Sequence, residues 1–385
     1  MGIKKSFEEI NAKIKDGKAV VVTAEEIIPM VEEKGAEKVA REVDVVTTAT
    51  FGPMCSSGVF LNMGHSDPPI KIKKAWFNNV LAYSGIAAVD VYLGAAEEAE
   101  KGNGMYGGAH VIQELLEGKK VHLKALGRGT DCYPTKEVEG EIALEDINEA
   151  IMFNPRNVYQ NYAAATNSTD STLYTYMGLL LPNFGNVTYS TSGQLSPMLC
   201  DPECRAIGVG TRIFLGGTEG YIAWHGTQHN PNQKRLENGV PAGPSGTLSL
   251  IGDMKKMSPE YIKAAVYEKY GTSLFVGAGV PIPVLDADMV EKLAVKDEDI
   301  HTVVIDYSVK SKNRPVIREV NYKELKSGEI TINGKPVMTA PMSSMKKARE
   351  IAEKLKGLIK DGSFYLTEPV EKLPADKSVG PMKLT

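Results

Sequence analysis

The first 50 residues alternate between amphipathic helical patterns and short apolar runs. Ser6 precedes the segment FEEINAKIK with Glu9 three residues later, and Thr23 precedes a second helical pattern with Glu26 in the same relative place. Both pairs have the spacing of a capping box, in which the first side chain and the later carboxylate satisfy free backbone N–H groups. The pattern predicts one helix from residue 7 and another over residues 24–43, with the β-branched strand AVVVT between them and VDVVTT after the second.

The rest of the chain mixes further helical patterns with strands and loops. A loop rich in Gly, Ser and Pro (residues 49–69) surrounds a short strand, GVFLNMG, and residues 75–126 predict a helix-like run, a Gly-rich turn, the helix AHVIQELLEG and the strand KVHLKAL. From residue 141 to 198 the pattern does not separate strands from loops. Two Gly-dense segments, GVGTRIFLGGTEGYIAWHGTQ and SLFVGAGVPIPVLD, predict strands joined by turns. The C-terminal part predicts the helix SPEYIKAAVYEKY, the strand HTVVIDYSV, the hairpin EITINGKPV and the helix MSSMKKAREIAEKLKGLIKDG.

Strands that alternate with amphipathic helices favour the α/β class. We expect mixed sheets with flanking helices and Gly-rich loops that carry the site, and the sequence leaves the strand order open. The catalytic region is expected to span residues 1–373, with a division into subdomains 1–140 and 141–373 as one option. Residues 374–385 read as a linker or loose tail.

Composition excludes several classes of protein. The 385 residues include 44 Lys plus Arg and 48 Asp plus Glu, a net charge of −4, which argues against nucleic-acid binding through bulk positive charge. With 42% hydrophobic and 24% charged residues the chain is typical of globular proteins. No apolar run reaches the roughly 18 residues of a membrane helix, and the charged N-terminal segment does not resemble a secretory signal. We therefore expect a cytoplasmic protein.

Two of the four cysteines lie in settings that suit chemistry. Cys132 follows a predicted strand in GRGTDCYP, and Cys55 lies in FGPMCSSG. Loops at the carboxyl ends of strands are where α/β proteins place reacting groups. Arg128 would favour a thiolate at Cys132, whereas the adjacent Asp131 would disfavour it. The two loops could meet at one pocket, and the alternative is two unrelated buried thiols.

Standard metal and nucleotide motifs are not found. Cys200 and Cys204 supply two ligands, whereas a structural zinc site has four. His225 and His229 are four residues apart, but the Gly and the Asn-Pro pair in WHGTQHNP argue against a helix that would place both on one face. We expect no metal. The glycines of GVGTRIFLGG do not fit a dinucleotide fingerprint, and neither a P-loop nor a G-x-S-x-G elbow occurs. These glycines more simply mark turns beside a pocket, where Arg212 could reach an anionic substrate.

Four long motifs carry a resemblance to a known family. The segments VTTATFGPMCSSGVFLNMGHSDPPIK, GKKVHLKALGRGTDCYPTKE, NPRNVYQNYAAATNS and GVGTRIFLGGTEGYIAWHGTQH resemble the homocysteine biosynthesis family of anaerobic archaea and bacteria, the L-aspartate semialdehyde sulfurtransferases. The resemblance extends from about residue 5 to 370. Many relatives continue into a pair of CBS modules, and this chain stops near that linker.

The resemblance implies an enzyme that converts aspartate semialdehyde to homocysteine with sulfur held as a cysteine persulfide. In the family the persulfide cysteine lies in the G-R-G-T-D-C-Y-P motif, here Cys132, and the second cysteine, here Cys55, hands over sulfur or forms a transient disulfide with it. Release of the product thiol needs electrons, and the sequence has no flavin, nicotinamide or iron–sulfur fingerprint. We therefore expect no cofactor bound by this chain and a ferredoxin-type iron–sulfur partner protein.

The expected substrate also suggests binding residues. Arg128 and Arg212 are expected to hold the substrate carboxylate, since Arg can bind it with two parallel hydrogen bonds. Ser56 and Ser57 are expected to donate to a sulfur anion or a developing oxyanion, and His225 to protonate that oxyanion. Two alternatives stay open: another thiol-dependent acyl or CoA-type transferase, and a non-catalytic sulfur-carrier or ligand-binding scaffold. The sulfur donor and the oligomeric state, with a homo-oligomer as one option, are also open.

Overall fold

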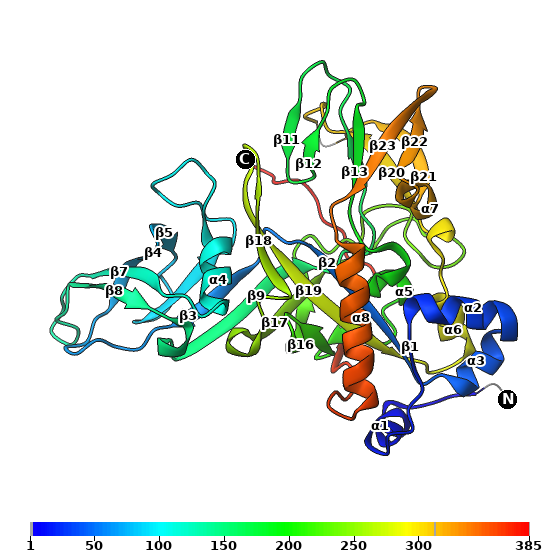
Figure 1. The fold of residues 1–385 in the computed structure, drawn as a ribbon, viewed down its shortest axis with the longest axis horizontal. Coiled ribbons are helices and arrows are strands. Elements are labelled where there is room, and N and C mark those ends of the chain that lie inside the picture. Colours follow the sequence, from blue (N-terminus) through cyan, green and yellow to red (C-terminus); the bar gives the residue numbers. More distant parts are fainter. Residues whose placement is uncertain (1–2, 312, 385) are drawn as a thin grey trace.

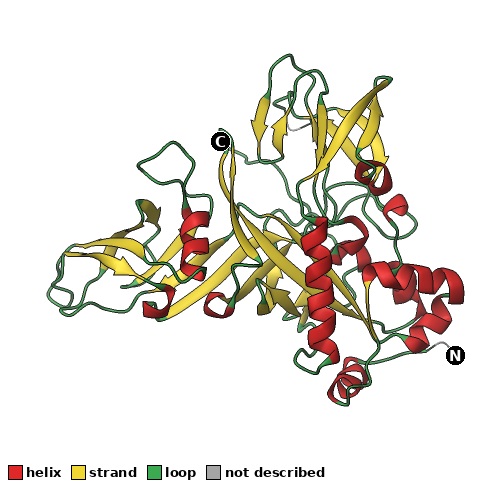
Figure 2. Cartoon of the chain, viewed as in Figure 1, coloured by secondary structure: helices red, strands yellow, loops and turns green. Residues whose placement is uncertain are grey.

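The computed structural model describes residues 3–311 and 313–384, and it has a mixed α/β architecture (Figures 1 and 2). The expected fold class is therefore confirmed. The central sheet has the order β1 (Val21–Thr23), β2 (Val45–Pro53), β19 (Gly271–Pro283), β15 (Arg212–Leu215), β16 (Thr218–His225), β17 (Leu248–Asp253), β9 (Glu149–Asn157), β3 (Gly58–Asn62) and β6 (Asp90–Gly94), and β18 (Ile262–Tyr267) pairs with β19 outside this path. The central sheet thus takes strands from both sides of residue 140.

Two further sheets project from the central one (Figure 1). The arm is the sheet β5 (Val80–Ala82), β4 (Ile72–Phe77), β7 (Val121–Gly127) and β8 (Glu137–Ile142) together with its connecting loops. The upper lobe is the sheet β21 (Val316–Asn321), β20 (His301–Asp306), β10 (Ala164–Thr166), β13 (Asn186–Tyr189), β23 (Lys335–Pro341) and β22 (Glu329–Ile332). Two short pairs complete the strands: β11 (Leu173–Thr175) with β12 (Gly178–Leu180), and β14 (Gly208–Val209) with β24 (Glu371–Lys372).

Most helices of the described chain lie on the outside of these sheets (Figure 2), whereas the short helix Pro197–Cys200 is buried. The helices are α1 (Phe7–Lys15), α2 (Ala24–Lys34), α3 (Ala36–Glu42), α4 (Gly108–Leu116), α5 (Pro197–Cys200), α6 (Ala287–Leu293), α7 (Tyr322–Lys326) and α8 (Met345–Lys360). None of the helices in the described part of the chain is long and apolar enough to cross a membrane.

The longest helix, α8, packs across the centre of the molecule on β2 and β19. A Cβ atom added to Gly277 or Gly279 of β19 would lie 2.8 or 3.1 Å from the side chain of Ile351 on α8. The G-A-G segment of this strand therefore provides the shallow surface that lets the helix lie close to the sheet. Strand β19 in turn pairs antiparallel with the whole of β2, from Val45 to Pro53, and so fixes where β2 ends.

Most local predictions from the sequence are confirmed. Both capping boxes form, at the starts of α1 and α2. The predicted helix over residues 24–43 is wrong in one respect: Gly35, with φ of 77°, breaks it into α2 and α3. Other confirmed elements are β1, β2, β3, α4, β7, β20, the hairpin β22–β23 and α8, and the Gly-dense segments form β14, β15, β16 and β19.

Two predicted helices are strands instead. The run after residue 75 forms β4, β5 and β6, because Asn78 and Asn79, with φ of 50° and 65°, make a tight turn between β4 and β5. The segment SPEYIKAAVYEKY contains β18, which pairs with β19 from Ile262 to Tyr267. Pairing with a strand that is already held by β2 outweighs the helical pattern of this segment.

A buried carboxylate, Asp44, joins α1 to the start of β2. Its Oδ1 accepts hydrogen bonds from Lys5 Nζ at 2.9 Å and Lys13 Nζ at 2.6 Å, and its Oδ2 accepts one from the Val20 amide at 3.0 Å. The side chain of Asp44 is 2% exposed. Burial disfavours its charged form, but the hydrogen bonds from Lys13, Val20 and Lys5 outweigh burial and lower the pKa of Asp44 below its usual value.

We expect Asp44→Asn to lower the free energy of unfolding by about 3–5 kcal/mol at pH 7, because it leaves the buried Lys5 ammonium without its anionic partner. The pKa of Asp44 is lower in the folded than in the unfolded state. The stabilisation that Asp44 contributes is therefore fully present at pH values above its unfolded-state pKa, and it is lost as the pH falls through its folded-state pKa. Urea denaturation at pH 7 and at stepwise lower pH measures both effects. Asp16→Asn, at an exposed ion pair with Lys18, is the control and should change stability by less than about 1 kcal/mol.

Candidate functional site

The Cys55 loop follows the end of β2. The chain turns back through residues 54–57 into β3, and the Ser57 amide donates to the Met54 carbonyl oxygen at 3.0 Å. The half-buried Cys55 side chain lines a cavity of about 270 Å³, which we call the Cys55 cavity. The predicted placement of this thiol on a loop after a strand is therefore confirmed, and the loop places the thiol at the wall of this cavity.

Distant parts of the chain build the other walls of the Cys55 cavity. The end of β9 and the loop after it contribute the cation Arg156 and the rings of Tyr159 and Tyr162. The β11–β12 hairpin contributes the ring of Tyr176, and the β18–β19 hairpin contributes those of Tyr267 and Tyr270. Among the described residues, no Asp or Glu side chain lines this cavity. The cavity is therefore aromatic, with one cation and one thiol at its wall.

A buried amide, Asn154, fixes the Cys55 loop against β9. Its Nδ2 donates to Ser57 Oγ at 2.8 Å, and its Oδ1 accepts from the Arg156 amide at 3.1 Å. The Ser56 hydroxyl lies 3.1 Å from the Arg156 carbonyl oxygen and 3.3 Å from Asn154 Oδ1. Of the two predicted serines, Ser56 lines the cavity, whereas Ser57 is buried beneath it. Asn154 therefore sets the position of the thiol loop relative to Arg156.

Arg156 lines the cavity, and its guanidinium has no protein partner among the described residues. Within residues 3–311 and 313–384 it makes no ion pair and no side-chain hydrogen bond, and its buried Nε is unsatisfied. An unpaired buried donor of this kind is costly unless a ligand or solvent completes it. Arg156 lies in the motif NPRNVYQNYAAATNS, and the sequence pattern alone indicates no role for it.

Two tyrosines of the cavity and the neighbouring Tyr307 form a chain of hydroxyl groups. The Tyr162 hydroxyl lies 3.2 Å from the Tyr176 hydroxyl, which lies 2.9 Å from that of Tyr307. Burial raises the pKa of Tyr159 to about 12, and the charge of Arg156 opposes this rise. Burial, followed by the nearby Cys55 sulfur, raises the pKa of Tyr270 to about 12. These hydroxyls therefore keep their protons at neutral pH and can donate hydrogen bonds.

The chain has 16 Tyr against 9 Phe, and this excess is the one feature of the sequence that relates to these tyrosines. The count alone does not indicate a site, because buried tyrosines are common in proteins.

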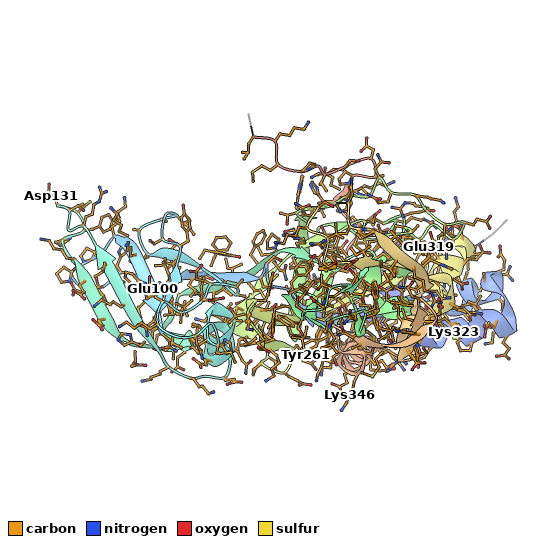
Figure 3. All side chains as sticks on the ribbon, turned by 90° about the horizontal axis from the view of Figure 1, so that it is seen from above. Glu100, Asp131, Tyr261, Glu319, Lys323 and Lys346 are labelled. Carbon is orange, nitrogen blue, oxygen red and sulfur yellow. The ribbon has the colours of Figure 1, made fainter. Side chains whose placement is uncertain are left out.

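Cys132 lies elsewhere, at the tip of the arm. The turn between β7 and β8 holds it, with Thr130 and Tyr133 paired across the turn and Thr130 Oγ1 at 3.6 Å from the Cys132 sulfur. Cys132 is exposed, as is the adjacent Asp131, which lies at the extreme end of the molecule (Figure 3). Cys132 is not among the residues that line the Cys55 cavity. The hypothesis that the two cysteine loops share one pocket is therefore not met within a single chain.

The remaining predicted binding residues also lie outside the Cys55 cavity. Arg128 lines a groove of about 640 Å³ on the arm, with Lys71, Lys73 and Lys74 nearby. Arg212 pairs with Glu219 at 3.3 Å and lies over the ring of Tyr221.

His225 accepts a hydrogen bond from Lys377 Nζ at 2.6 Å, and burial together with the Lys377 charge lowers its pKa. Lys377 belongs to the C-terminal segment, whose Pro374 carbonyl oxygen also contacts His229 Nε2 at 3.1 Å. Neither histidine lines the Cys55 cavity.

The other two cysteines are set for packing. Cys200 is buried and donates to the Gln194 carbonyl oxygen at 3.1 Å, and Cys204 packs against the core. Burial raises the pKa of both thiols well above the usual value, which makes them poor nucleophiles. In the part of the chain that the structure describes, no three His, Cys, Asp or Glu side chains are grouped so that they could hold a metal ion.

Comparisons with known proteins agree over nearly the whole chain. The family model described as homocysteine biosynthesis enzyme, sulfur-incorporation, matches residues 19–366. The chain is 55% identical over 383 residues to an L-aspartate semialdehyde sulfurtransferase of Methanosarcina acetivorans, covering 100% of this chain and 75% of that protein. It is 54% identical over 386 residues to one of Methanocaldococcus jannaschii, covering 96% and 74%.

A third relative, an uncharacterized protein of Methanothermobacter thermautotrophicus, is 29% identical over 333 residues, with 84% of this chain and 72% of that protein covered. The comparison with solved structures gives no significant match. The family resemblance seen in the sequence is confirmed: the chain belongs to the sulfur-incorporating homocysteine biosynthesis enzymes.

Proposed function

We propose that this chain converts L-aspartate semialdehyde to L-homocysteine with sulfur delivered from a cysteine persulfide. The relatives that carry the name L-aspartate semialdehyde sulfurtransferase support this activity. The observation that carries it in the structure is the Cys55 cavity, where a thiol and an unpaired guanidinium line one small space. A volume of about 270 Å³ suits a four-carbon amino-acid aldehyde, whereas a CoA-type substrate needs a larger site.

The cavity supplies what addition of sulfur to an aldehyde requires. A persulfide sulfur at Cys55 attacks the aldehyde carbon, a C–S bond forms, and the carbonyl oxygen becomes an alkoxide. The protonated hydroxyls of Tyr159 and Tyr270 are suited to donate hydrogen bonds to that oxygen, since their pKa values are raised to about 12. In this scheme the sulfur meets the aldehyde at Cys55, and Cys132 acts before or after that step.

The electron balance calls for a reductant. Starting from sulfide and the aldehyde, formation of homocysteine takes up two electrons and two protons and releases one water. We propose that these electrons come from a ferredoxin-type iron–sulfur protein, because the sequence has no fingerprint for a flavin or nicotinamide. The reaction belongs in the cytoplasm, where free cysteines such as those of this chain do not form lasting structural disulfides.

Cys132 and Cys55 can share the sulfur chemistry through a transient disulfide. Forming the disulfide from the two free thiols takes one two-electron oxidation by an electron acceptor, and this oxidation is needed only once because the later steps restore the disulfide. Sulfide that attacks the disulfide leaves a persulfide on one sulfur and a free thiol on the other. After C–S bond formation, the free thiol attacks the Cys55 sulfur, releases the substrate sulfur as a thiol and restores the disulfide. The two electrons from the iron–sulfur protein then reduce the former aldehyde carbon as water leaves.

Because Cys132 lies at the far end of the arm from the Cys55 cavity in one chain, we propose that two chains form the working unit. In a symmetric dimer, the arm of each subunit would bring its own Cys132 to the Cys55 cavity of the other. The homo-oligomer expected from the sequence would then be required for catalysis.

The activity is tested by oxidising the purified chain briefly, removing the oxidant, and incubating the chain without oxygen with aspartate semialdehyde, sulfide and a reduced low-potential iron–sulfur protein. We expect many molecules of homocysteine per chain, measured by mass spectrometry after alkylation, and no product when any one component is omitted. Homocysteine at the level of the protein-free mixture would refute the proposal, and no more than one product per chain would favour a sulfur-carrier scaffold.

The persulfide has a separate test. After brief oxidation and exposure to sulfide, peptide mapping should find one added sulfur atom on the peptide with Cys132 or with Cys55. A Cys132→Ser variant should lose this atom, since no disulfide then forms. Homocysteine formation without any sulfur adduct on the chain would contradict the persulfide step while leaving the overall activity in place.

A further inference from the structure

The Cys55 cavity contains a positive charge that the protein leaves without a counterion. Arg156 is the cation among the lining residues, no carboxylate lines the cavity, and the guanidinium has no protein partner within the described chain. Elsewhere in the molecule, the half-buried Arg205 binds Asp286 and Asp288, and Arg212 pairs with Glu219. An arginine in a cavity without an acidic neighbour is suited to bind an anion that enters from outside.

The surroundings of Arg156 restrict the kind of anion. The cavity of about 270 Å³ is walled by five tyrosine rings, and its other polar side chains are hydroxyls and the Cys55 thiol. A phosphorylated or nucleotide-sized ligand would have one guanidinium and no glycine-rich turn or helix N-terminus to hold its phosphates, unlike usual phosphate sites. A single carboxylate on a small molecule matches one guanidinium, which can give it two parallel hydrogen bonds.

The position of Arg156 relative to the Cys55 loop is fixed by the buried side chain of Asn154. Arg156 and the Cys55 loop are both bonded to Asn154, whose side chain contacts Ser57 and the Arg156 amide. Both groups also influence the same two hydroxyls, because Arg156 and Cys55 act in opposite directions on the pKa of Tyr159 and of Tyr270. A ligand held at the guanidinium would therefore extend its other end towards the thiol.

We propose that Arg156 is the carboxylate-binding residue of the Cys55 cavity and selects small carboxylate-bearing electrophiles for reaction at Cys55. This inference rests on the proposed function. In it, Arg156 binds the α-carboxylate of the amino-acid aldehyde, and the aldehyde carbon lies near the Cys55 sulfur. Arg156 takes the place that the sequence analysis gave to Arg128 and Arg212, which lie outside the cavity.

The test uses two alkylating reagents that differ in one group. Iodoacetate carries a carboxylate and iodoacetamide is its neutral counterpart, and peptide mapping gives the rate for each at Cys55. The quantity compared is the rate with iodoacetate divided by the rate with iodoacetamide, and the free thiol 2-mercaptoethanol gives the reference value of this ratio. At Cys55 of the wild type we expect the ratio to be about tenfold higher than the reference, in line with one charge-assisted hydrogen-bonded pair. Arg156→Gln should bring the ratio down to that of 2-mercaptoethanol.

Two variants make the result specific. Arg212→Gln removes the same group outside the cavity and should leave the ratio unchanged, and Arg156→Lys should keep part of the preference, since it retains charge without the two-pronged geometry. An unchanged ratio in Arg156→Gln, or a loss in Arg212→Gln instead, would overturn the assignment. If Arg156→Gln does not fold, the rate ratios of the wild type and of Arg156→Lys test the assignment instead. A wild-type ratio equal to that of 2-mercaptoethanol would by itself exclude a carboxylate site.

A second readout separates this inference from the proposed reaction. L-Homoserine keeps the amino-acid head and has an alcohol in place of the aldehyde, so it should slow alkylation of Cys55 by iodoacetamide in the wild type but not in Arg156→Gln. If these effects appear while no variant or wild type forms homocysteine, the carboxylate site stands and the proposed reaction is wrong. If homocysteine forms and neither effect appears, the reaction stands and Arg156 is not its carboxylate ligand.

Discussion

Cys55→Ala is expected to reduce homocysteine formation by at least about a thousandfold, to the level of the reaction without protein. The substitution removes the sulfur at the wall of the cavity where we place the aldehyde, and covalent catalysis has no substitute for its nucleophile. Steady-state assays with aspartate semialdehyde, sulfide and the reduced iron–sulfur protein measure the loss. Binding of L-homoserine, followed through the fluorescence of the cavity tyrosines, should change little, since the Arg156 side chain is untouched.

The matched control is Cys204→Ala. It removes a thiol that packs against the core outside the cavity, so it should leave activity near that of the wild type. Wild-type activity in Cys55→Ala would place the attacking sulfur elsewhere and would end the assignment of this cavity as the reaction site.

Mixing two inactive variants is expected to restore activity. Cys132→Ala should also abolish homocysteine formation, because it removes the thiol that loads sulfur and cleaves the intermediate. Mixed in equal amounts and allowed to exchange subunits, Cys55→Ala and Cys132→Ala should reach about a quarter of the wild-type rate. Half of the dimers then contain one of each chain, and each of these has one of its two shared sites intact.

The control for mixing is the double variant Cys55→Ala, Cys132→Ala combined with either single variant, which should stay inactive in every proportion. Light scattering or analytical ultracentrifugation checks that the chains associate. Dimers that exchange subunits without any recovery of activity would show that Cys132 serves the cavity of its own chain, through a movement of the arm.

The location of Cys132 also bears on the electron donor that we propose. An exposed thiol at the tip of an arm can meet a protein surface directly, and the groove beside it carries Arg128, Lys71, Lys73 and Lys74. None of these four side chains has an acidic partner in the described part of the chain. An acidic electron donor would therefore be attracted to the arm rather than to the aromatic cavity.

The sequence determined the elements that depend on neighbouring residues. Capping boxes at Ser6 and Thr23 and the turn at Asn333 and Gly334 involve groups only a few residues apart, so their patterns predict them correctly. The same holds for the loop that bears Cys55, because a strand followed by Gly, Pro and Ser defines it locally. The family motifs, quoted as continuous segments, were sufficient to identify the family.

Only the tertiary structure decided how the site is assembled. Cys55 and Arg156 come together because β9 pairs with β3, so that Asn154 reaches the serines of the loop that precedes β3. Tyr270 joins them because β18, which has a helical pattern, pairs with β19. Such contacts depend on strand order, and residue spacing along the chain carries no information about strand order. For the same reason two similar cysteine motifs gave no sign that one lies in a cavity and the other at the end of an arm.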